Sequence, residues 1–134
     1  MGSGVVQAIL DEVKNEIFSN SSTVKKFQNI VEILYKRLYV DVCSLYILNH
    51  DQKLELYATE GLSKESINKT FLDLDEGLVG QIAKAKRTLI FSNIWNNENF
   101  SYKPETAEDP YYTLLGTPIY EQNLLLGILV IQNK

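Results

Sequence analysis

Apolar side chains recur at three- and four-residue spacing through the first part of the chain, which is the period of one face of an α-helix. One such stripe covers residues 5–18 and a second covers residues 23–39. The polar run Asn20-Ser21-Ser22 separates them and offers residues that stop one helix and cap the next. The pattern therefore predicts two amphipathic helices ahead of any strand.

The period then changes to that of β-strands. Residues 42–48 and 54–59 are rich in β-branched and aromatic side chains and flank a polar turn, so we expect a β-hairpin. A short strand over residues 70–74 leads into a helix that begins near Gly77, and residues 89–91 form another short strand.

Residues 114–120 and 124–132 predict a final pair of strands. Pro118 cannot donate a ladder hydrogen bond, so its strand should lie at an edge or carry a bulge there. Residues 124–131 lack polar alternation, which is typical of a strand covered on both faces. We therefore expect an α+β sandwich, in which an antiparallel sheet of five to six strands carries helices on one face and a layer of loop and helix on the other.

The segment from 92 to 113 has no regular period and exceeds the usual length of a loop in a compact domain. Its large aromatic side chains are Trp95, Phe100, Tyr102, Tyr111 and Tyr112. A segment this rich in aromatic residues should fold over the sheet rather than remain disordered. Two interpretations stay open, because such a lid can cover either the core or a ligand pocket.

Length and composition exclude several classes of protein. A chain of 134 residues with 45% hydrophobic and 22% charged residues fits one globular domain. The net charge of −4, with bases and acids interspersed, argues against nucleic-acid binding. No stretch approaches the length of a membrane span, and no export signal is visible. We expect a cytoplasmic protein, with residues 1–4 a cloning remnant and residues 5–134 a single domain.

Several short blocks together resemble a GAF domain. The blocks are Val40–Leu48, Ala58–Leu62, Glu76–Gly80, Phe100–Thr106, Leu115–Ile119 and Leu126–Gln132. The strand Asp-Val-Cys-Ser-Leu-Tyr and the loop Phe-x-Tyr-x-Pro-Glu-Thr are narrower signals. They resemble the N-terminal GAF domain of nitrogen-related enzyme I, a family of phosphoenolpyruvate-protein phosphotransferases. The resemblance covers roughly residues 5–132.

This resemblance implies a sensory domain ahead of phosphotransferase modules, which adjusts phosphate flow in response to nitrogen metabolites. The phosphorylated histidine of that family lies in the later modules and has no counterpart here. We expect that the fragment is not an enzyme and has no cofactor, and that its parent is a phosphoenolpyruvate-protein phosphotransferase. Its expected partners are those phosphotransferase modules and a small metabolite, with glutamine and 2-oxoglutarate as candidates.

Histidine and cysteine, which often act as metal ligands or nucleophiles, occur only once each in the chain. His50, the only histidine, lies in the expected hairpin turn without a second imidazole, so no metal site or catalytic triad is expected. Cys43 lies inside a strand, where a free cysteine behaves as a small apolar side chain. Residues 68–76 match a loose cyclic-nucleotide GAF pattern, but the gap between Lys69 and Phe71 is too short for that family.

The acids Asp73, Asp75 and Glu76 precede the helix that begins near Gly77, where carboxylates complement the helix dipole. This position argues against an anionic ligand at the helix start. Gly77 and Gly80 lack the lysine of a phosphate loop, and we expect them to let the helix pack closely on the sheet.

If the aromatic lid covers a pocket, the candidate ligand-binding residues are Tyr46, Ser92, Trp95, Phe100, Tyr102, Lys103, Glu105, Tyr112 and Thr117. The alternative is a ligand-free dimerisation domain. In that case Val6, Leu10, Val13 and Ile17 form a seam with a second copy. The same stripe could instead pack on the domain's own sheet, and the sequence favours neither arrangement.

Overall fold

Six antiparallel strands form one sheet in the computed structural model, which describes residues 2–17, 19, 22–106 and 111–134. The strands are β1 Val42–Leu48, β2 Lys53–Glu60, β3 Phe71–Asp73, β4 Leu89–Ser92, β5 Thr113–Glu121 and β6 Leu124–Asn133. Their order across the sheet is β3-β2-β1-β6-β5-β4. The expected α+β sandwich with an antiparallel sheet is confirmed.

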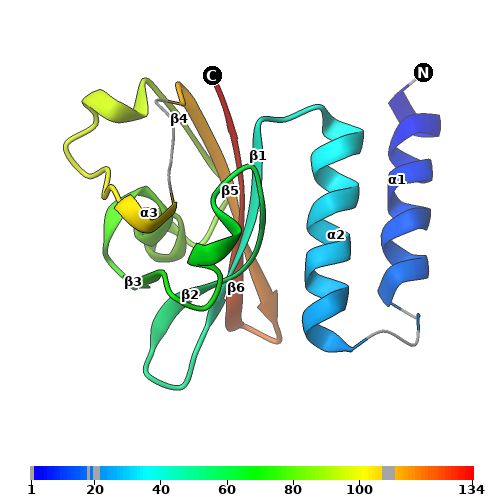
Figure 1. Cartoon of the computed structure of the whole chain (residues 1–134), viewed down its shortest axis with the longest axis horizontal. Helices are drawn as coiled ribbons and strands as arrows, with labels where there is room; N and C mark the ends of the chain where they lie inside the picture. Colours follow the sequence, from blue (N-terminus) through cyan, green and yellow to red (C-terminus); the bar gives the residue numbers. More distant parts are fainter. Residues whose placement is uncertain (1, 18, 20–21, 107–110) are drawn as a thin grey trace.

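Two helices lie on one side of the sheet (Figure 1). They are α1 (Gly2–Ile17) and α2 (Thr23–Leu38). The side chain of Ser22 accepts the backbone N–H of Lys25 and so caps the start of α2. The predicted end of the first helix at Phe18, and the separating residues Asn20 and Ser21, lie outside the described residues.

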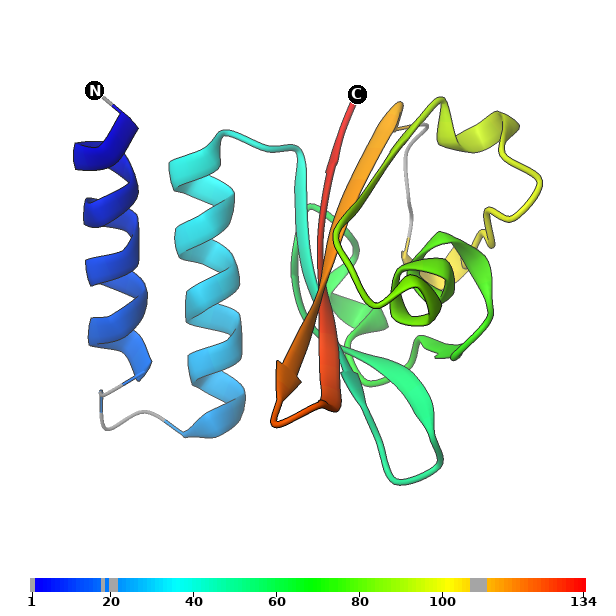
Figure 2. The same cartoon turned by 180° about the vertical axis from the view of Figure 1, so that it is seen from behind.

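Helix α2 packs on β1 and β2, and α1 lies on the far side of α2, away from the sheet (Figure 2). Packing of the first helix on its own sheet is therefore wrong. Val5, Val6 and Leu10 are exposed on α1 because no element of the described chain covers that side. Ile9, another residue of the apolar stripe, is buried.

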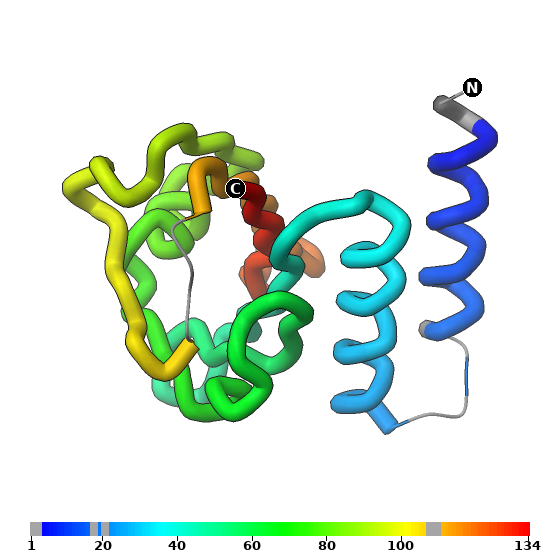
Figure 3. Tube along the Cα trace, turned by 45° about the horizontal axis from the view of Figure 1, so that its top comes forward, coloured from blue at the N-terminus to red at the C-terminus, as the bar shows by residue number. Residues whose placement is uncertain are grey.

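The opposite side of the sheet carries α3 (Gly77–Ala85) and the long segment that joins β4 to β5 (Figure 3). Short 3-10 turns break this segment at Ile94–Asn96 and Pro104–Thr106, and another, Lys64–Ser66, precedes β3. Residues 107–110 of the predicted lid lie outside the described residues. The described part folds over the sheet, as its aromatic content predicts.

Two hydrophobic cores result, one on each face. The core under α2 is small and centres on Val31, Cys43, Leu45 and Ala58. The other core is larger and joins the sheet to α3 and the long segment, with Leu54, Leu56, Leu78, Ile82, Ile94 and Ile128 fully or almost fully buried.

Strand β6 lies in the middle of the sheet, between β1 and β5. The β6 side chains that point toward α3 are buried. Leu124 and Leu126 are exposed because α2 packs on β1 and β2 and leaves this end of β6 uncovered. The expectation that β6 is covered along both faces therefore holds only in part. Pro118 lies beyond the end of β4, whose pairing with β5 stops at Gly116, and a bulge follows at Ile119. Strand β5 is therefore not an edge strand, although its outer side is unpaired at Pro118, and the alternative of a bulge close to Pro118 is confirmed.

Candidate functional site

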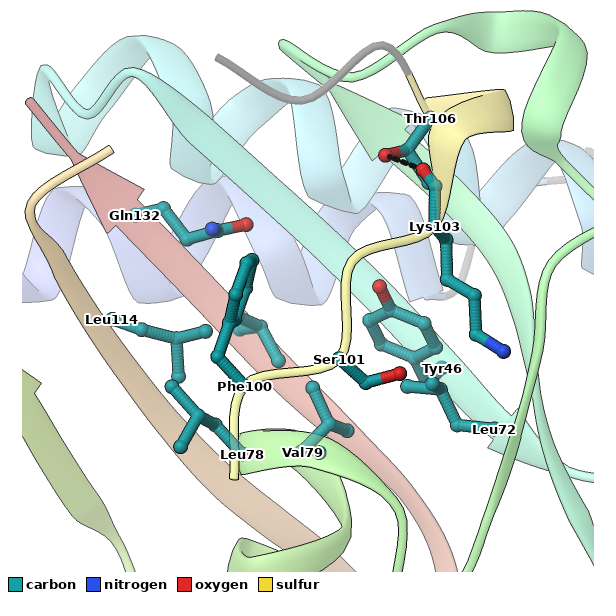
Figure 4. Close-up of a pocket in the computed structure, with 12 residues that line it drawn as sticks. Tyr46, Leu72, Leu78, Val79, Phe100, Ser101, Lys103, Thr106, Leu114 and Gln132 are labelled. Atoms are coloured by element: carbon teal, nitrogen blue, oxygen red, sulfur yellow. Dashed lines mark hydrogen bonds between the residues drawn. The ribbon is translucent and has the colours of Figure 1, made fainter. Parts of the chain in front are cut away.

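A small cavity lies between the sheet and residues 97–106, a segment that we call the strap (Figure 4). Its volume is about 30 Å³, which is room for about one water molecule. Its apolar lining consists of Leu72, Leu78, Val79, Phe100, Leu114 and Val130. Its polar lining consists of Tyr46, Ser101, Lys103, Thr106 and Gln132. The cavity thus has an apolar body and a cluster of groups able to form hydrogen bonds.

Glu76 holds the strap against the start of α3. Its Oε2 atom accepts hydrogen bonds from Ser101 Oγ at 2.8 Å and Lys103 Nζ at 2.9 Å. Its Oε1 atom accepts the backbone N–H of Asp73 at 3.1 Å. The side chains of Lys103 and Glu76 are only 28% and 29% exposed, so water screens this ion pair incompletely.

These contacts also set the ionisation of Glu76. Its partial burial alone raises the pKa of the carboxyl group, but hydrogen bonds from Lys103, Ser101 and the Asp73 backbone, together with the charge of Lys103, outweigh that effect. The net result is a pKa lowered from its ordinary value of 4.5. Glu76 is therefore a carboxylate at neutral pH, and the ion pair with Lys103 is formed.

Two glycines make room for this arrangement. Gly77 has a φ of +69°, and a Cβ atom there would lie 3.1 Å from Ser101 Cβ on the strap. At Gly80 a Cβ atom would lie 2.7 Å from the carbonyl carbon of Asp75. The expectation that these glycines bring the helix close to the sheet is wrong. Gly77 instead admits the strap, and Gly80 admits the turn that precedes the helix.

The far end of the strap is tied to the β2–β3 connection. The Ser63 N–H donates to the Thr106 carbonyl at 2.7 Å, and Thr70 Oγ1 donates to Glu105 Oε2 at 3.0 Å. Thr106 Oγ1 also donates to the Lys103 carbonyl at 2.7 Å within the strap. The strap is therefore fixed in its middle by Glu76 and at its C-terminal end by the β2–β3 connection.

Trp95 packs against two aromatic rings of the strap. Trp95 lies 4.9 Å from Phe100 and 5.3 Å from Tyr102, measured between ring centroids. Phe100 is half-buried and lines the cavity, whereas Trp95 and Tyr102 are 40% and 45% exposed. Any movement of the strap therefore changes the surroundings of Trp95.

Among the nine predicted ligand-binding residues, the structure brings three to the cavity: Tyr46, Phe100 and Lys103. The other six lie outside its lining. Trp95 packs against the strap, Tyr102 belongs to it, and Glu105 anchors it to Thr70. Ser92, Tyr112 and Thr117 belong to the β4–β5 region, where Thr117 Oγ1 and Thr88 Oγ1 share a hydrogen bond of 2.8 Å. The role of all nine in ligand binding stays a prediction.

Sequence reasoning missed four polar residues at this site: Glu76, Ser101, Thr106 and Gln132. The position of Glu76 ahead of a helix was noticed in the sequence, but its carboxylate was assigned only to the helix dipole. Gln132 is only 4% exposed and follows an unbroken apolar run in β6, so its position was a usable sign of a polar pocket. Thr106 is the last residue of the Phe-x-Tyr-x-Pro-Glu-Thr loop, but that motif did not indicate a role at a cavity, and nothing in the sequence marked Ser101.

The remaining chemical candidates lie elsewhere. His50 is exposed in the β1–β2 turn, as expected. Cys43 is fully buried under α2, and its burial, followed by the charge of Glu60, raises the pKa of the thiol to about 12. Within the described ranges, no cluster of three or more His, Cys, Asp or Glu side chains could hold a metal ion. None of the described helices has the length and apolar character needed to cross a membrane.

Several curated proteins and solved structures resemble this chain. It is 29% identical over 117 residues to an Escherichia coli K12 protein named phosphoenolpyruvate-dependent phosphotransferase system, which covers 87% of this chain. It is 24% identical over 123 residues, 90% of its length, to the nif-specific regulatory protein of Azospirillum lipoferum. The chain spans only 16% and 20% of these two relatives.

Among solved structures, the GAF domain of a phosphoenolpyruvate-protein phosphotransferase from Coxiella burnetii superposes with a TM-score of 0.90 at 30% identity. The alignment covers 99% of this chain and 80% of that one. The corresponding domain from Acinetobacter gives a TM-score of 0.87, also at 30% identity, over 100% of this chain and 80% of that one. The model of the GAF domain family matches residues 23–134. This chain therefore belongs to the GAF domain family.

Proposed function

We propose that this chain is the sensory domain of a larger phosphoenolpyruvate-protein phosphotransferase and that it regulates that enzyme by binding a small nitrogen-related metabolite under the strap. The observation that carries the proposal is a polar cavity closed by an ion-paired segment. Similarity to GAF domains of such phosphotransferases and to a nif-specific regulator supports the assignment. Catalysis then belongs to the phosphotransferase modules of the parent, in the cytoplasm, and this domain supplies control.

Binding must move the strap. The cavity of about 30 Å³ is much smaller than a typical ligand pocket of roughly 300 Å³ or more. The most direct way to enlarge it is to release the Lys103–Glu76 ion pair, because Phe100, Ser101 and Lys103 all belong to the lining. The ligand then selects the open form, and the difference in affinity between the two forms is the regulatory signal.

The broken ion pair favours a zwitterionic ligand. Opening the strap leaves a lysine ammonium and a glutamate carboxylate without their partners, and partly buried charges without partners are costly. An α-amino acid brings a carboxylate for Lys103 and an ammonium group for Glu76. Of the two candidate metabolites, glutamine meets both needs, whereas 2-oxoglutarate would bring two further negative charges close to Glu76.

Isothermal titration calorimetry with glutamine and 2-oxoglutarate tests this proposal, with Trp95 fluorescence as a second readout. We expect glutamine to bind and 2-oxoglutarate to bind more weakly. At about 100 times its dissociation constant, glutamine should stabilise the domain by about 2.7 kcal/mol. Lys103→Met should abolish binding, whereas Lys84→Met, which changes an exposed lysine of α3, should leave it intact. Absence of binding by both metabolites would refute the proposed ligand class.

A second candidate function is dimerisation without a ligand. The observation in its favour is the outer side of α1, where Val5, Val6 and Leu10 are 56%, 54% and 46% exposed. Two copies of this chain could bury that surface in a helix seam. Sedimentation equilibrium separates the two candidates: a dimer that Leu10→Lys dissociates, with no response to either metabolite, favours the second.

A further inference from the structure

Helix α2 is joined to the sheet by one side-chain amide at an unpaired part of β2. Strand β3 pairs with β2 only over Lys53–Glu55, so the outer edge of β2 has no neighbouring strand at Thr59. Gln28 of α2 fills that gap. Its Nε2 atom donates to the Thr59 carbonyl at 3.1 Å, and its Oε1 atom accepts the Thr59 N–H at 3.2 Å. The Gln28 amide thus replaces a peptide group of the missing strand.

The same glutamine has a third contact. Its Nε2 atom also donates to Glu60 Oε2 at 2.8 Å, and Glu60 forms an ion pair with Lys64. Gln28 is half-buried, and the core beside it places Phe27 edge-on against the ring of Tyr57. Because three hydrogen bonds share one side chain, Gln28 fixes the position of α2 along β2 more tightly than apolar packing alone.

Thr59 extends this connection through the sheet. Its hydroxyl group lies 2.8 Å from Ser44 Oγ on β1, and both residues are fully buried. Ser44 pairs across the sheet with Val130, which lines the cavity, and Tyr46, another lining residue, follows two positions later on the same face of β1. We call Tyr46 and Val130 the floor of the cavity. Thr59 therefore contacts Ser44, the residue beside this floor, with its side chain and α2 with its backbone.

On its other side, α2 is joined to α1. Asn29, the residue after Gln28, donates its amide to Glu16 Oε1 at 2.9 Å, and Arg37 forms an ion pair with Glu12. Polar contacts therefore join Ser44, beside the cavity floor, to α2 through Thr59 and Gln28, and other polar contacts join α2 to α1, the helix farthest from the strap (Figure 1).

We propose that Gln28 is a coupling residue: it makes the cavity floor and α2 move together, so that a change in the cavity reaches the two N-terminal helices. Its regulatory meaning rests on the proposed function, but the coupling itself does not require a ligand. The positions most sensitive to it are the amide of Thr59 and the turn of α2 that contains Gln28.

Native-state hydrogen exchange, followed residue by residue by NMR, tests the coupling without a ligand. Val130→Ala perturbs the floor beside Ser44, and Leu114→Ala is the matched control, since Leu114 lines the same cavity from β5. We expect Val130→Ala to speed exchange in α2 around residue 28 by roughly fivefold, a factor equivalent to about one net hydrogen bond. Leu114→Ala should leave these amides close to their wild-type rates relative to global unfolding.

The Gln28→Met variant completes the test, because methionine keeps the length of the side chain and removes all three hydrogen bonds. In that background the effect of Val130→Ala on α2 should disappear, while its effect on β1 and β6 remains. An equal effect in both backgrounds, or an equal effect of Leu114→Ala, overturns the proposal. Should Gln28→Met fail to fold, Thr59→Val removes only the hydroxyl contact with Ser44 and must give the same loss.

Failure of this test leaves the proposed function untouched, because glutamine binding is measured separately. If glutamine binds, its effect on exchange in α2 should likewise depend on Gln28. A glutamine effect on α2 that survives Gln28→Met would overturn the coupling role while leaving the ligand site in place.

Discussion

The face of the sheet that carries α2 and the face that carries the strap are both apolar, but different kinds of structure cover them. A regular helix closes the first face with its apolar stripe around Val31. An irregular segment closes the second, and it is held in part by the polar contacts of Glu76. Irregular segments open at lower cost than packed helices, because fewer contacts must break together. The cavity lies on the face that opens more easily.

The largest expected effects come from the two cores themselves. Leu56→Ala on the strap side and Leu45→Ala on the α2 side should each lower the free energy of unfolding by about 2–5 kcal/mol. Both side chains are nearly inaccessible to solvent, at 0% and 6%. Urea denaturation measures this, and similar losses would show that both faces belong to one cooperative unit. A loss below about 1 kcal/mol for only one variant would separate the faces.

A smaller effect is expected where the strap meets α3. Gly77→Ala places a side chain at a φ of +69° and 3.1 Å from Ser101 Cβ. We expect a loss of about 1–3 kcal/mol of stability and faster hydrogen exchange in the strap. Gly4→Ala is the control, since a Cβ atom there has nothing within 4 Å. That exposed helical position should gain up to about 1 kcal/mol, and an equal loss at both positions would contradict the argument.

The ion pair of the strap should affect local opening more than global stability. Lys103→Met removes the ammonium group that pairs with Glu76, and a partly exposed ion pair contributes about 1 kcal/mol or less. We expect a small change in the urea midpoint but a clear increase in acrylamide quenching of Trp95. Quenching that stays at the wild-type level would mean that the aromatic packing alone holds the strap.

Acid should open the strap through Glu76. The pKa of this carboxyl group is lowered below 4.5 in the folded state, so its stabilising contribution is present above that pH and is lost as the pH falls through the folded-state pKa. Trp95 quenching should therefore rise as the pH falls below 4.5, before global unfolding. Glu76→Gln should remove this step. A step that persists in Glu76→Gln has another origin.

The smallest expected effect can be measured without a mutation, because each face of the sheet carries one residue that reports on its cover. Cys43, the single cysteine, lies under α2, and Trp95, the single tryptophan, lies over the strap. With the pKa of its thiol raised to about 12, Cys43 should react with a disulfide reagent at pH 8 only when α2 leaves the sheet. Mild denaturant should change Trp95 quenching before Cys43 reacts. The reverse order would place the weaker cover on the α2 side.

The periodicity of the sequence predicted most ends of the helices and strands to within three residues. It also identified the antiparallel sheet, and aromatic content predicted that the described part of segment 92–113 folds over it. Regular elements are predictable because one period places every apolar side chain on one face. The bulge near Pro118 was predicted for a similar local reason, because proline has no backbone N–H to donate in any strand.

The cavity could be predicted only in part. Tyr46, Phe100 and Lys103 were predicted because they belong to a strand or a loop that the sequence already indicated as part of a possible pocket. Glu76 was misjudged because its partners, Ser101 and Lys103, lie 25 and 27 positions later in the chain. The role of Gln28 depends on Thr59, a contact between residues 31 positions apart. Contacts between residues so far apart in the chain do not follow the period of a helix or a strand, so sequence patterns cannot reveal them.

The sequence by itself determined the fold class and the elements, because these follow from local propensity and from the spacing of apolar residues. It also indicated the family, through the resemblance of several short blocks to GAF domains. The tertiary structure decided which side of α1 is exposed, which residues close the cavity and which side chain joins α2 to the sheet. Those features depend on pairs of polar atoms brought together from distant parts of the chain. Only folding fixes such distances, since hydrogen bonds and ion pairs act over a few ångströms in space rather than along the sequence.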